Sequence, residues 1–169
     1  MLTLAAVCLG FLLSQFATTW RDIWKGRKAK RLISEELSSN LAILPQKREI
    51  IGQIIRELSR KKILPGESVP FMTTSYDLNL HLAYEYLKPL QRDSLHVIYE
   101  RAKQSDAYLS RFESELLKHL DLKLIPNPYA MFVVRMREIL ETYRVIEDLS
   151  TKYISDMPVD VFRRESRHQ

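Results

Sequence analysis

The sequence predicts an all-α protein in which one N-terminal transmembrane helix is followed by an antiparallel bundle of about four helices. Residues 2–19 carry no charged side chain and are long enough to cross a bilayer. The rest of the chain is rich in Leu, Ile, Glu, Lys and Arg, and the whole sequence has only four glycines. This composition favours helix over strand, and the apolar residues recur at helical spacing.

The predicted anchor covers residues 1–20. A helix rises about 1.5 Å per residue, so this length matches a hydrocarbon layer of roughly 30 Å. Trp20 and Trp24 lie one turn apart, in the region where interfacial aromatic side chains are common. A cleaved signal peptide is the alternative, but it would begin with basic residues, and no Lys or Arg precedes Arg21. We therefore expect the anchor to stay attached.

A basic juxtamembrane collar follows at residues 21–31. It holds six basic residues against the single acid Asp22, namely Arg21, Lys25, Arg27, Lys28, Lys30 and Arg31. Basic flanks remain cytoplasmic, so the N-terminus is predicted outside and the C-terminal domain inside. The single cysteine, Cys8, rules out an internal disulfide, which fits a reducing compartment.

The net charge of the chain is explained by this collar. The formal net charge is +5, and the six basic residues and one acid of the collar also sum to +5. The remaining residues are therefore neutral in total, and we expect no direct DNA binding. A collar of this kind also attracts anionic lipid, by about 1 kcal/mol per basic residue near the surface.

One face of the predicted anchor carries small residues. Ala6, Gly10, Ser14 and Thr18 recur every four residues, and Gln15 adds a polar amide beside them. Small residues at this spacing let helices approach closely in lipid, so the pattern predicts a homo-oligomer. The alternative is that such residues are simply common in spanning helices.

The cytoplasmic helical bundle is predicted over residues 32–157. Its first helix, from Leu32 to about Lys62, has a stripe formed by Ile33, Leu37, Leu41, Leu44, Ile51, Ile55 and Leu58. The stripe keeps its phase through Pro45, which favours one kinked helix, although Pro45 could instead begin a second helix. Glu36 and Asn40 lie beside this stripe as either buried polar partners or edge residues.

A loop is predicted at residues 63–77, because it contains two prolines and a glycine, and Thr73, Thr74, Ser75 and Asp77 are candidate N-caps for the next helix. Residues 78–87 alternate as a strand would, but no second strand is available for pairing. We therefore expect a short helix that buries Leu80, Tyr84 and Leu87.

Two further long helices complete the predicted bundle. One begins at Pro89, with the stripe Leu95, Ile98, Ala102, Leu109, Phe112, Leu116 and Leu120. The other runs from about Tyr129 to Ile154, with Phe132, Met136, Ile139, Leu140, Tyr143, Ile146, Leu149 and Tyr153 on one side. Residues 158–169 form a polar tail.

No catalytic site is predicted with an evident chemical basis. Arg163 and His168 have the R-x4-H spacing of HEPN ribonucleases, but they lie in the polar tail, and one such match is expected by chance in a chain with this many arginines. No P-loop or other nucleotide or protease motif is present, and the histidine spacing is wrong for zinc. We predict a protein that is not an enzyme and has no cofactor or metal.

Two helical rows are candidate ligand sites. Arg92, His96 and Glu100 follow one another at intervals of four, which suits either an anion site or an ion-pair ladder, and the ladder is favoured. Arg135, Arg137 and Arg144 lie on the last helix near Glu138, Glu141 and Glu147, which suggests a salt-bridged surface. The ligand-binding residues predicted from these rows are Arg92, His96, Arg135 and Arg137.

The order of these features resembles a broad group of bacterial membrane-tethered helical proteins. The segments that carry the resemblance are RLISEELSSNLAIL, VPFMTTSYD and RDSLHVIYERAKQSD. In layout and size, and in the R-x4-H tail, the chain is also similar to CRISPR-associated ancillary membrane effectors. Some of these effectors are gated by cyclic oligoadenylate, and others carry a degenerate HEPN-like domain.

This resemblance implies a non-enzymatic, oligomeric protein of the bacterial inner membrane that acts in antiviral defence. Its cytoplasmic domain would sense a partner or a small anionic ligand such as a cyclic oligoadenylate. Two other hypotheses are a HEPN-like ribonuclease that uses Arg163 and His168, and a passive membrane-tethered scaffold.

Overall fold

The computed structural model describes residues 2–64, 68–123 and 125–156, with side chains described from Leu13 onward. These residues form five α-helices and one short 3₁₀ helix, without any strand. The all-α prediction is therefore confirmed for the described part of the chain.

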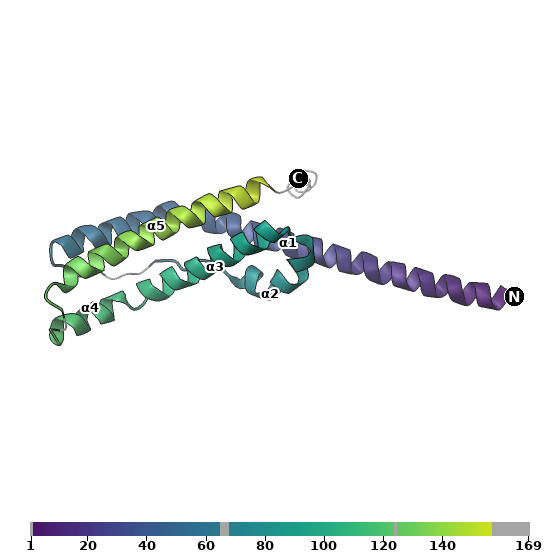
Figure 1. Cartoon of the computed structure of the whole chain (residues 1–169), viewed down its shortest axis with the longest axis horizontal. Helices are drawn as coiled ribbons and strands as arrows, with labels where there is room; N and C mark the ends of the chain where they lie inside the picture. The colour runs from purple at the N-terminus through teal and green to yellow at the C-terminus, as the bar shows by residue number, and fades with distance from the viewer. Residues whose placement is uncertain (1, 65–67, 124, 157–169) are drawn as a thin grey trace, which may run out of the picture.

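One helix, α1 (Leu2–Ser59), extends from the N-terminus into the centre of the bundle. Its 58 residues correspond to a length of about 87 Å. Figure 1 shows its N-terminal part projecting alone from the bundle. Side chains from Leu13 to Trp20 are all exposed, and the first buried residue is Gly26. The predicted anchor, collar and first bundle helix thus form one continuous helix.

Pro45 lies inside α1 and does not divide it. A proline in a helix interior removes one hydrogen bond and costs about 3 kcal/mol. Pro45 is itself exposed, whereas Leu44 and Lys47 beside it are 0% and 2% exposed. Burial of Leu44 against the rest of the bundle is favourable and helps to offset the lost hydrogen bond. The expectation of one helix rather than two is therefore confirmed.

A membrane-spanning segment is not found among the described residues, since no helix there is both long and apolar enough to cross a bilayer. The side chains of residues 1–12, which form most of the predicted anchor, lie outside the described part. The transmembrane helix therefore stays a prediction.

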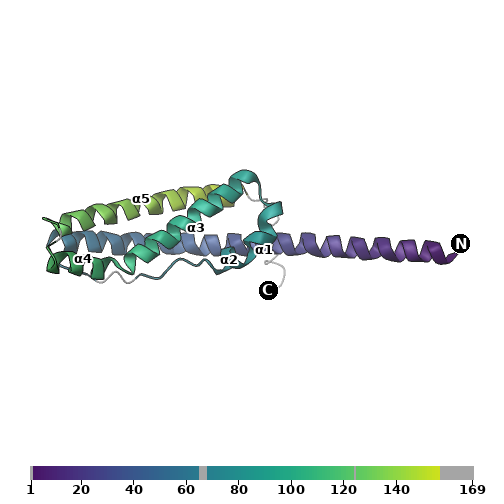
Figure 2. The ribbon, with the colours of Figure 1, turned by 60° about the horizontal axis from the view of Figure 1, so that its bottom comes forward.

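The bundle contains α2 (Thr74–Ala83), η1 (Tyr84–Tyr86), α3 (Pro89–Leu109), α4 (Phe112–Asp121) and α5 (Pro128–Ser155). Figures 1 and 2 show α5 antiparallel to α1, but α3 runs in the same direction as α1. The chain returns along the bundle between α1 and α2, so α3 starts at the end where α1 enters. The main pairs that pack together (α1 with α2, α1 with α5, and α3 with α5) are therefore antiparallel, as the sequence predicts.

The core follows the predicted stripes closely. In α1, Ile33, Leu37, Leu44, Ile51 and Leu58 are at most 1% exposed, while Leu41 and Ile55 are partly buried. The stripe of α5 packs against this row and against the stripe of α3, and the largest fully buried side chains of α3 and α5 include Tyr99, Phe132 and Tyr143.

Three details of the predicted elements are wrong. The loop expected at residues 63–77 ends at Thr73, because α2 begins at Thr74, so Thr74, Ser75 and Asp77 lie inside the helix. The helix expected from Pro89 to Leu120 ends at Leu109, and α4 begins at Phe112. The apolar spacing passes through this break in phase, because Leu109 and Phe112 are both buried, so the sequence pattern contains no sign of it. Tyr84, expected to be buried, is 49% exposed because it falls in η1, and Ala83 occupies the buried position instead.

Gly26 and Gly52 of α1 have different surroundings. A Cβ atom added at Gly26 would lie 2.0 Å from Cε2 of Tyr86, whereas one at Gly52 would meet only the flexible Arg56 side chain at 3.7 Å. Gly26 therefore allows η1 to pack directly against the α1 backbone.

This difference predicts opposite effects for two matched substitutions. Gly52→Ala should raise the free energy of unfolding by about 0.5–1 kcal/mol, because alanine is the better helix former. Gly26→Ala should lower it, because the Tyr86 ring must move away from α1. Thermal unfolding of the detergent-solubilised chain, followed by circular dichroism, measures both. Equal stabilisation by the two changes would contradict this packing.

Candidate functional site

A row of buried polar residues on α1 fastens the segment that leads into α2. The Glu36 carboxylate accepts hydrogen bonds from the backbone N–H groups of Ser75 at 2.6 Å and Tyr76 at 3.1 Å. These N–H groups belong to the first turn of α2, where an anion is favourable. Glu36 thus takes the part of an N-cap, whereas the side chain of Thr73, at the N-cap position, makes no capping bond.

Asn40 and Lys47 continue the same row. The Asn40 amide both donates to the Met72 carbonyl at 2.7 Å and accepts from the Met72 N–H at 2.8 Å. Lys47 Nζ donates to Asp106 Oδ1 at 2.7 Å and to Ser68 Oγ at 3.0 Å. We call Glu36, Asn40 and Lys47 the α1 polar row.

The Lys47–Asp106 pair joins α1 to α3 and to the segment that precedes α2. Lys47 Nζ lies 4.2 Å from the centroid of the Phe71 ring, and the Phe71 N–H donates to Asp106 Oδ2 at 2.6 Å. Burial lowers the pKa of Lys47, and the hydrogen bond to Asp106 opposes this shift. Because every charge here has a partner on the chain itself, we assign the polar row to folding rather than to ligand binding.

Glu36 and Asn40 were predicted as either buried partners or edge residues, and the structure selects buried partners. Lys47 and Asp106 were not predicted. The sequence did contain a sign of their burial, because each lies on the buried face of its helix: Lys47 follows Leu44 by three residues, and Asp106 precedes Leu109 by three. A charged residue in phase with a buried stripe indicates a buried ion pair.

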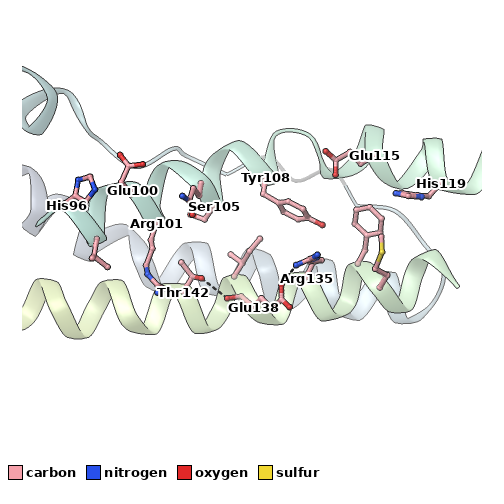
Figure 3. Close-up of a pocket in the computed structure, with 15 residues that line it drawn as sticks. His96, Glu100, Arg101, Ser105, Tyr108, Glu115, His119, Arg135, Glu138 and Thr142 are labelled. Atoms are coloured by element: carbon pink, nitrogen blue, oxygen red, sulfur yellow. Dashed lines mark hydrogen bonds and ion pairs between the residues drawn. The ribbon is translucent and has the colours of Figure 1, made fainter. Parts of the chain in front are cut away.

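A groove of about 900 Å³ lies between α3, α4 and α5, and we call it the α3–α5 groove. Its apolar lining includes Val97, Met131, Phe132 and Ile139. Figure 3 shows the polar side chains from α3 and α4 on one side and those from α5 on the other.

The rim of the α3–α5 groove carries both signs of charge. Its charged residues are Glu100, Arg101, Glu115, Arg135 and Glu138. Arg135 pairs with Glu138 at 2.9 Å, and both side chains are more than half exposed. With three carboxylates and two guanidinium groups, the rim does not resemble the strongly basic pocket that a polyanion alone would favour.

Aromatic side chains line one end of the groove. The His119 and Phe132 ring centroids are 6.0 Å apart, and those of Tyr108 and Phe132 are 6.5 Å apart. Burial raises the pKa of Tyr108 to about 12, so its hydroxyl is a neutral donor at physiological pH. His119 Nδ1 is buried and has no hydrogen-bond partner in the described part of the chain.

Two of the four predicted ligand residues reach this groove. His96 and Arg135 line it, whereas Arg92 and Arg137 do not. Arg92 instead donates from Nε to the Leu87 carbonyl at 3.0 Å, and its guanidinium lies 4.0 Å from the Tyr84 ring centroid. The predicted ladder of Arg92, His96 and Glu100 is wrong, because no ion pair links these three described residues.

The salt-bridged surface on α5 is confirmed with different pairs. Besides Arg135 with Glu138, Arg144 pairs with Glu141, while Arg137 is exposed. Groove residues such as Arg101 and His119 were missed, because the groove forms between helices whose relative placement the sequence does not reveal.

The collar residues lie along α1 where it enters the bundle. Arg21, Lys25, Arg27 and Lys28 are exposed, whereas Lys30 and Arg31 are partly buried. Lys25 Nζ lies 4.0 Å from Asp22 Oδ1, and Arg31 Nε lies 2.6 Å from Glu35 Oε1.

The small-residue face is described only in part. Ser14, Gln15 and Thr18 are exposed, and the Thr18 hydroxyl donates to the Ser14 carbonyl at 2.9 Å. Ala6 and Gly10 lie outside the described side chains, and Arg163 and His168 lie outside the described residues altogether.

Comparison with known proteins identifies no relative. No family model matches the chain, and neither a curated protein nor a solved structure matches it. Within the described residues, no cluster of His, Cys, Asp or Glu is arranged to hold a metal ion. The geometry of the chain itself is therefore the basis of the functional argument.

The polar row generates a stability prediction. Glu36→Ala should lower the free energy of unfolding by about 1.5–3 kcal/mol, because two N–H groups lose a charged acceptor. Glu35→Ala is the matched control, because Glu35 is exposed and pairs only along the helix surface. It should change stability by less than about 0.5 kcal/mol. Urea unfolding of the detergent-solubilised chain compares them, and equal effects would show that Glu36 does not cap α2.

Proposed function

We propose that this chain is a non-enzymatic protein of the bacterial inner membrane that self-associates. In this proposal residues 1–20 anchor it, the collar fixes the bundle on the cytoplasmic side, and the α3–α5 groove is the contact surface between bundles. A partner or small anionic ligand bound there would shift the association by favouring one arrangement of the subunits.

The observation that carries the proposal is the α3–α5 groove with its apolar floor and its rim of both charge signs. A two-fold contact places the same surface of each subunit face to face, so a self-complementary surface needs both signs. The rim supplies Arg101 and Arg135 against Glu100, Glu115 and Glu138. Val97, which is 37% exposed, and the partly buried Met131 supply exposed apolar area above the buried Phe132 and Ile139.

The groove also has features that suit a nucleotide as the ligand. Tyr108 and His119, which are partly exposed and pack against the buried Phe132 ring, offer rings for base stacking, and Arg135 lies at the same end of the groove in Figure 3. The three carboxylates of the rim oppose a free polyanion, so such a ligand would need basic groups from a second subunit. The setting in antiviral defence, and cyclic oligoadenylate as the ligand, rest on the resemblance alone.

Charge reversal tests the proposed contact without knowledge of the pairs that it forms. Arg101→Glu with Arg135→Glu leaves five carboxylates on the rim, and Glu115→Arg with Glu138→Arg leaves four guanidinium groups and one carboxylate. Each double variant should associate at least about tenfold more weakly than the native chain, because like charges meet. An equimolar mixture of the two should recover association.

Native mass spectrometry and light scattering in detergent measure these species. The control is Arg137→Glu with Arg144→Glu, which makes the same change of charge on α5 outside the groove, and it should associate normally. Loss of association in the control, or no rescue in the mixture, would contradict the proposed contact. Addition of cyclic oligoadenylates to the native chain tests whether such a ligand binds. If it does, the number of subunits in the assembly should change.

The ribonuclease hypothesis makes a different prediction, since removal of residues 160–169 would abolish its activity. The proposal made here expects this truncation to leave association unchanged. A passive scaffold is separated by replacing residues 1–20 with an unrelated spanning helix, which a scaffold tolerates and a self-associating anchor does not.

A further inference from the structure

Exposed apolar side chains gather at the end of the bundle from which α1 projects. Leu82 is 40% exposed, Tyr84 is 49% exposed, and Leu90 is 80% exposed. They belong to the end of α2, to η1 and to the start of α3, which Figures 1 and 2 place beside the emerging α1. We call Leu82, Tyr84, Lys88, Leu90 and Arg92 the η1 corner.

The η1 corner is fixed to α1 by close contacts. The Tyr86 ring lies against Gly26, where even one added carbon would clash. Lys30 Nζ lies 3.4 Å from both the Tyr86 carbonyl and Gln91 Oε1, so it bridges η1 and the start of α3. The position of the corner along α1 is therefore set by residues 26–30.

This position is close to the predicted membrane boundary. Six residues separate Trp20 from Gly26, which corresponds to about 9 Å along the helix. The headgroup region of each leaflet is roughly 5–8 Å thick. If the anchor ends near Trp20, the corner lies where the headgroups meet water.

The charge around the η1 corner suits an anionic surface. Residues 81–92 hold Lys88 and Arg92 against Glu85, and the adjacent collar adds its excess of basic residues. Burial lowers the pKa of Lys30, and the nearby positive charge of Lys88 lowers it further. The Arg92 guanidinium covers one face of the Tyr84 ring, so charge and aromatic surface are presented together.

We propose that the η1 corner is a second membrane contact, in which Leu82, Tyr84 and Leu90 enter the headgroup region of an anionic bilayer. This inference rests on the proposed anchoring of residues 1–20. Two contacts, α1 and the η1 corner, would then fix both the distance of the bundle from the bilayer and its rotation about the axis of α1. Lipid is favoured over a second copy, because anchored copies in one bilayer meet side by side, whereas the corner lies at the end of the bundle from which α1 projects toward the predicted anchor.

Site-specific fluorescence tests the proposal in the full chain. In a Cys8→Ser background, a single cysteine replaces Leu90, and an environment-sensitive fluorophore is attached. Two matched positions serve as controls: Phe16, 67% exposed within the predicted span, and Leu122, 59% exposed at the C-terminal end of α4. The labelled proteins are reconstituted into phosphatidylcholine–phosphatidylglycerol vesicles that carry spin-labelled lipids.

Headgroup spin labels should quench the fluorophore at position 90 at least about twofold more than that at position 122, and acyl-chain labels should quench position 16. Quenching at position 90 should weaken in vesicles of phosphatidylcholine alone, because cationic attraction to the surface is lost. If position 16 is quenched but position 90 matches position 122, the corner proposal fails and the anchor stands.

A lack of acyl-chain quenching at position 16 would overturn the anchor and the corner together. Fluorescence at position 90 that changes with protein concentration in detergent, without lipid, would assign the corner to a second copy and also overturn the proposal. A second variant, Leu82→Ser with the label still at position 90, should reduce the quenching while leaving the α-helical signal unchanged.

Discussion

The structure depends on the continuity of α1. The same helix that emerges alone at its N-terminal end provides the central buried stripe at its other end, from Ala29 to Leu58. An isolated helix has little stability of its own, so the bundle around residues 26–59 is what holds this segment in one conformation. Any force on the N-terminal half is thereby transmitted directly to the core rather than to a flexible linker.

The buried polar row of α1 determines how the rest of the chain is laid on this helix. Glu36, Asn40 and Lys47 hold the segment that leads into α2, and Lys47 also reaches α3 through Asp106. Apolar stripes alone would permit several registers, whereas paired buried charges are satisfied in only one. These contacts bring the chain back to the end where α1 enters, so that η1 packs on Gly26 and α3 runs parallel to α1.

Much of the fold could be predicted from the sequence, because helical periodicity directly records which face is buried. The stripes of α1 and α5 and the single helix through Pro45 follow from it. Residues 78–87 alternate as a strand would, so a helix is favoured there only because no second strand is available for pairing, and α2 ends at Ala83. The break between Leu109 and Phe112 could not be predicted, since the apolar spacing is unchanged across it. The antiparallel direction of the packed helices agrees with the predicted bundle, whereas the place along α1 where α2 begins is fixed by the hydrogen bonds of Glu36 and Asn40 and could not be predicted.

The candidate site was less accessible to sequence reasoning. His96 and Arg135 reach the α3–α5 groove, whereas Arg92 is occupied by the Leu87 carbonyl and the Tyr84 ring. Spacing on one helix identifies residues that share a face, but a groove requires faces of two helices to meet. The η1 corner is a similar case, because its exposed leucines become significant only through their place beside α1.

The claim that α1 is a rigid link between the anchor and the core is tested most directly by a distance measurement. Spin labels at Asp22 and Ser39, both exposed, would lie 17 residues apart in a Cys8→Ser background of the full chain in lipid nanodiscs. A continuous helix predicts one narrow distance distribution, with the two backbone positions about 25 Å apart. A broad or two-peaked distribution would show a hinge between collar and bundle, and would contradict the account.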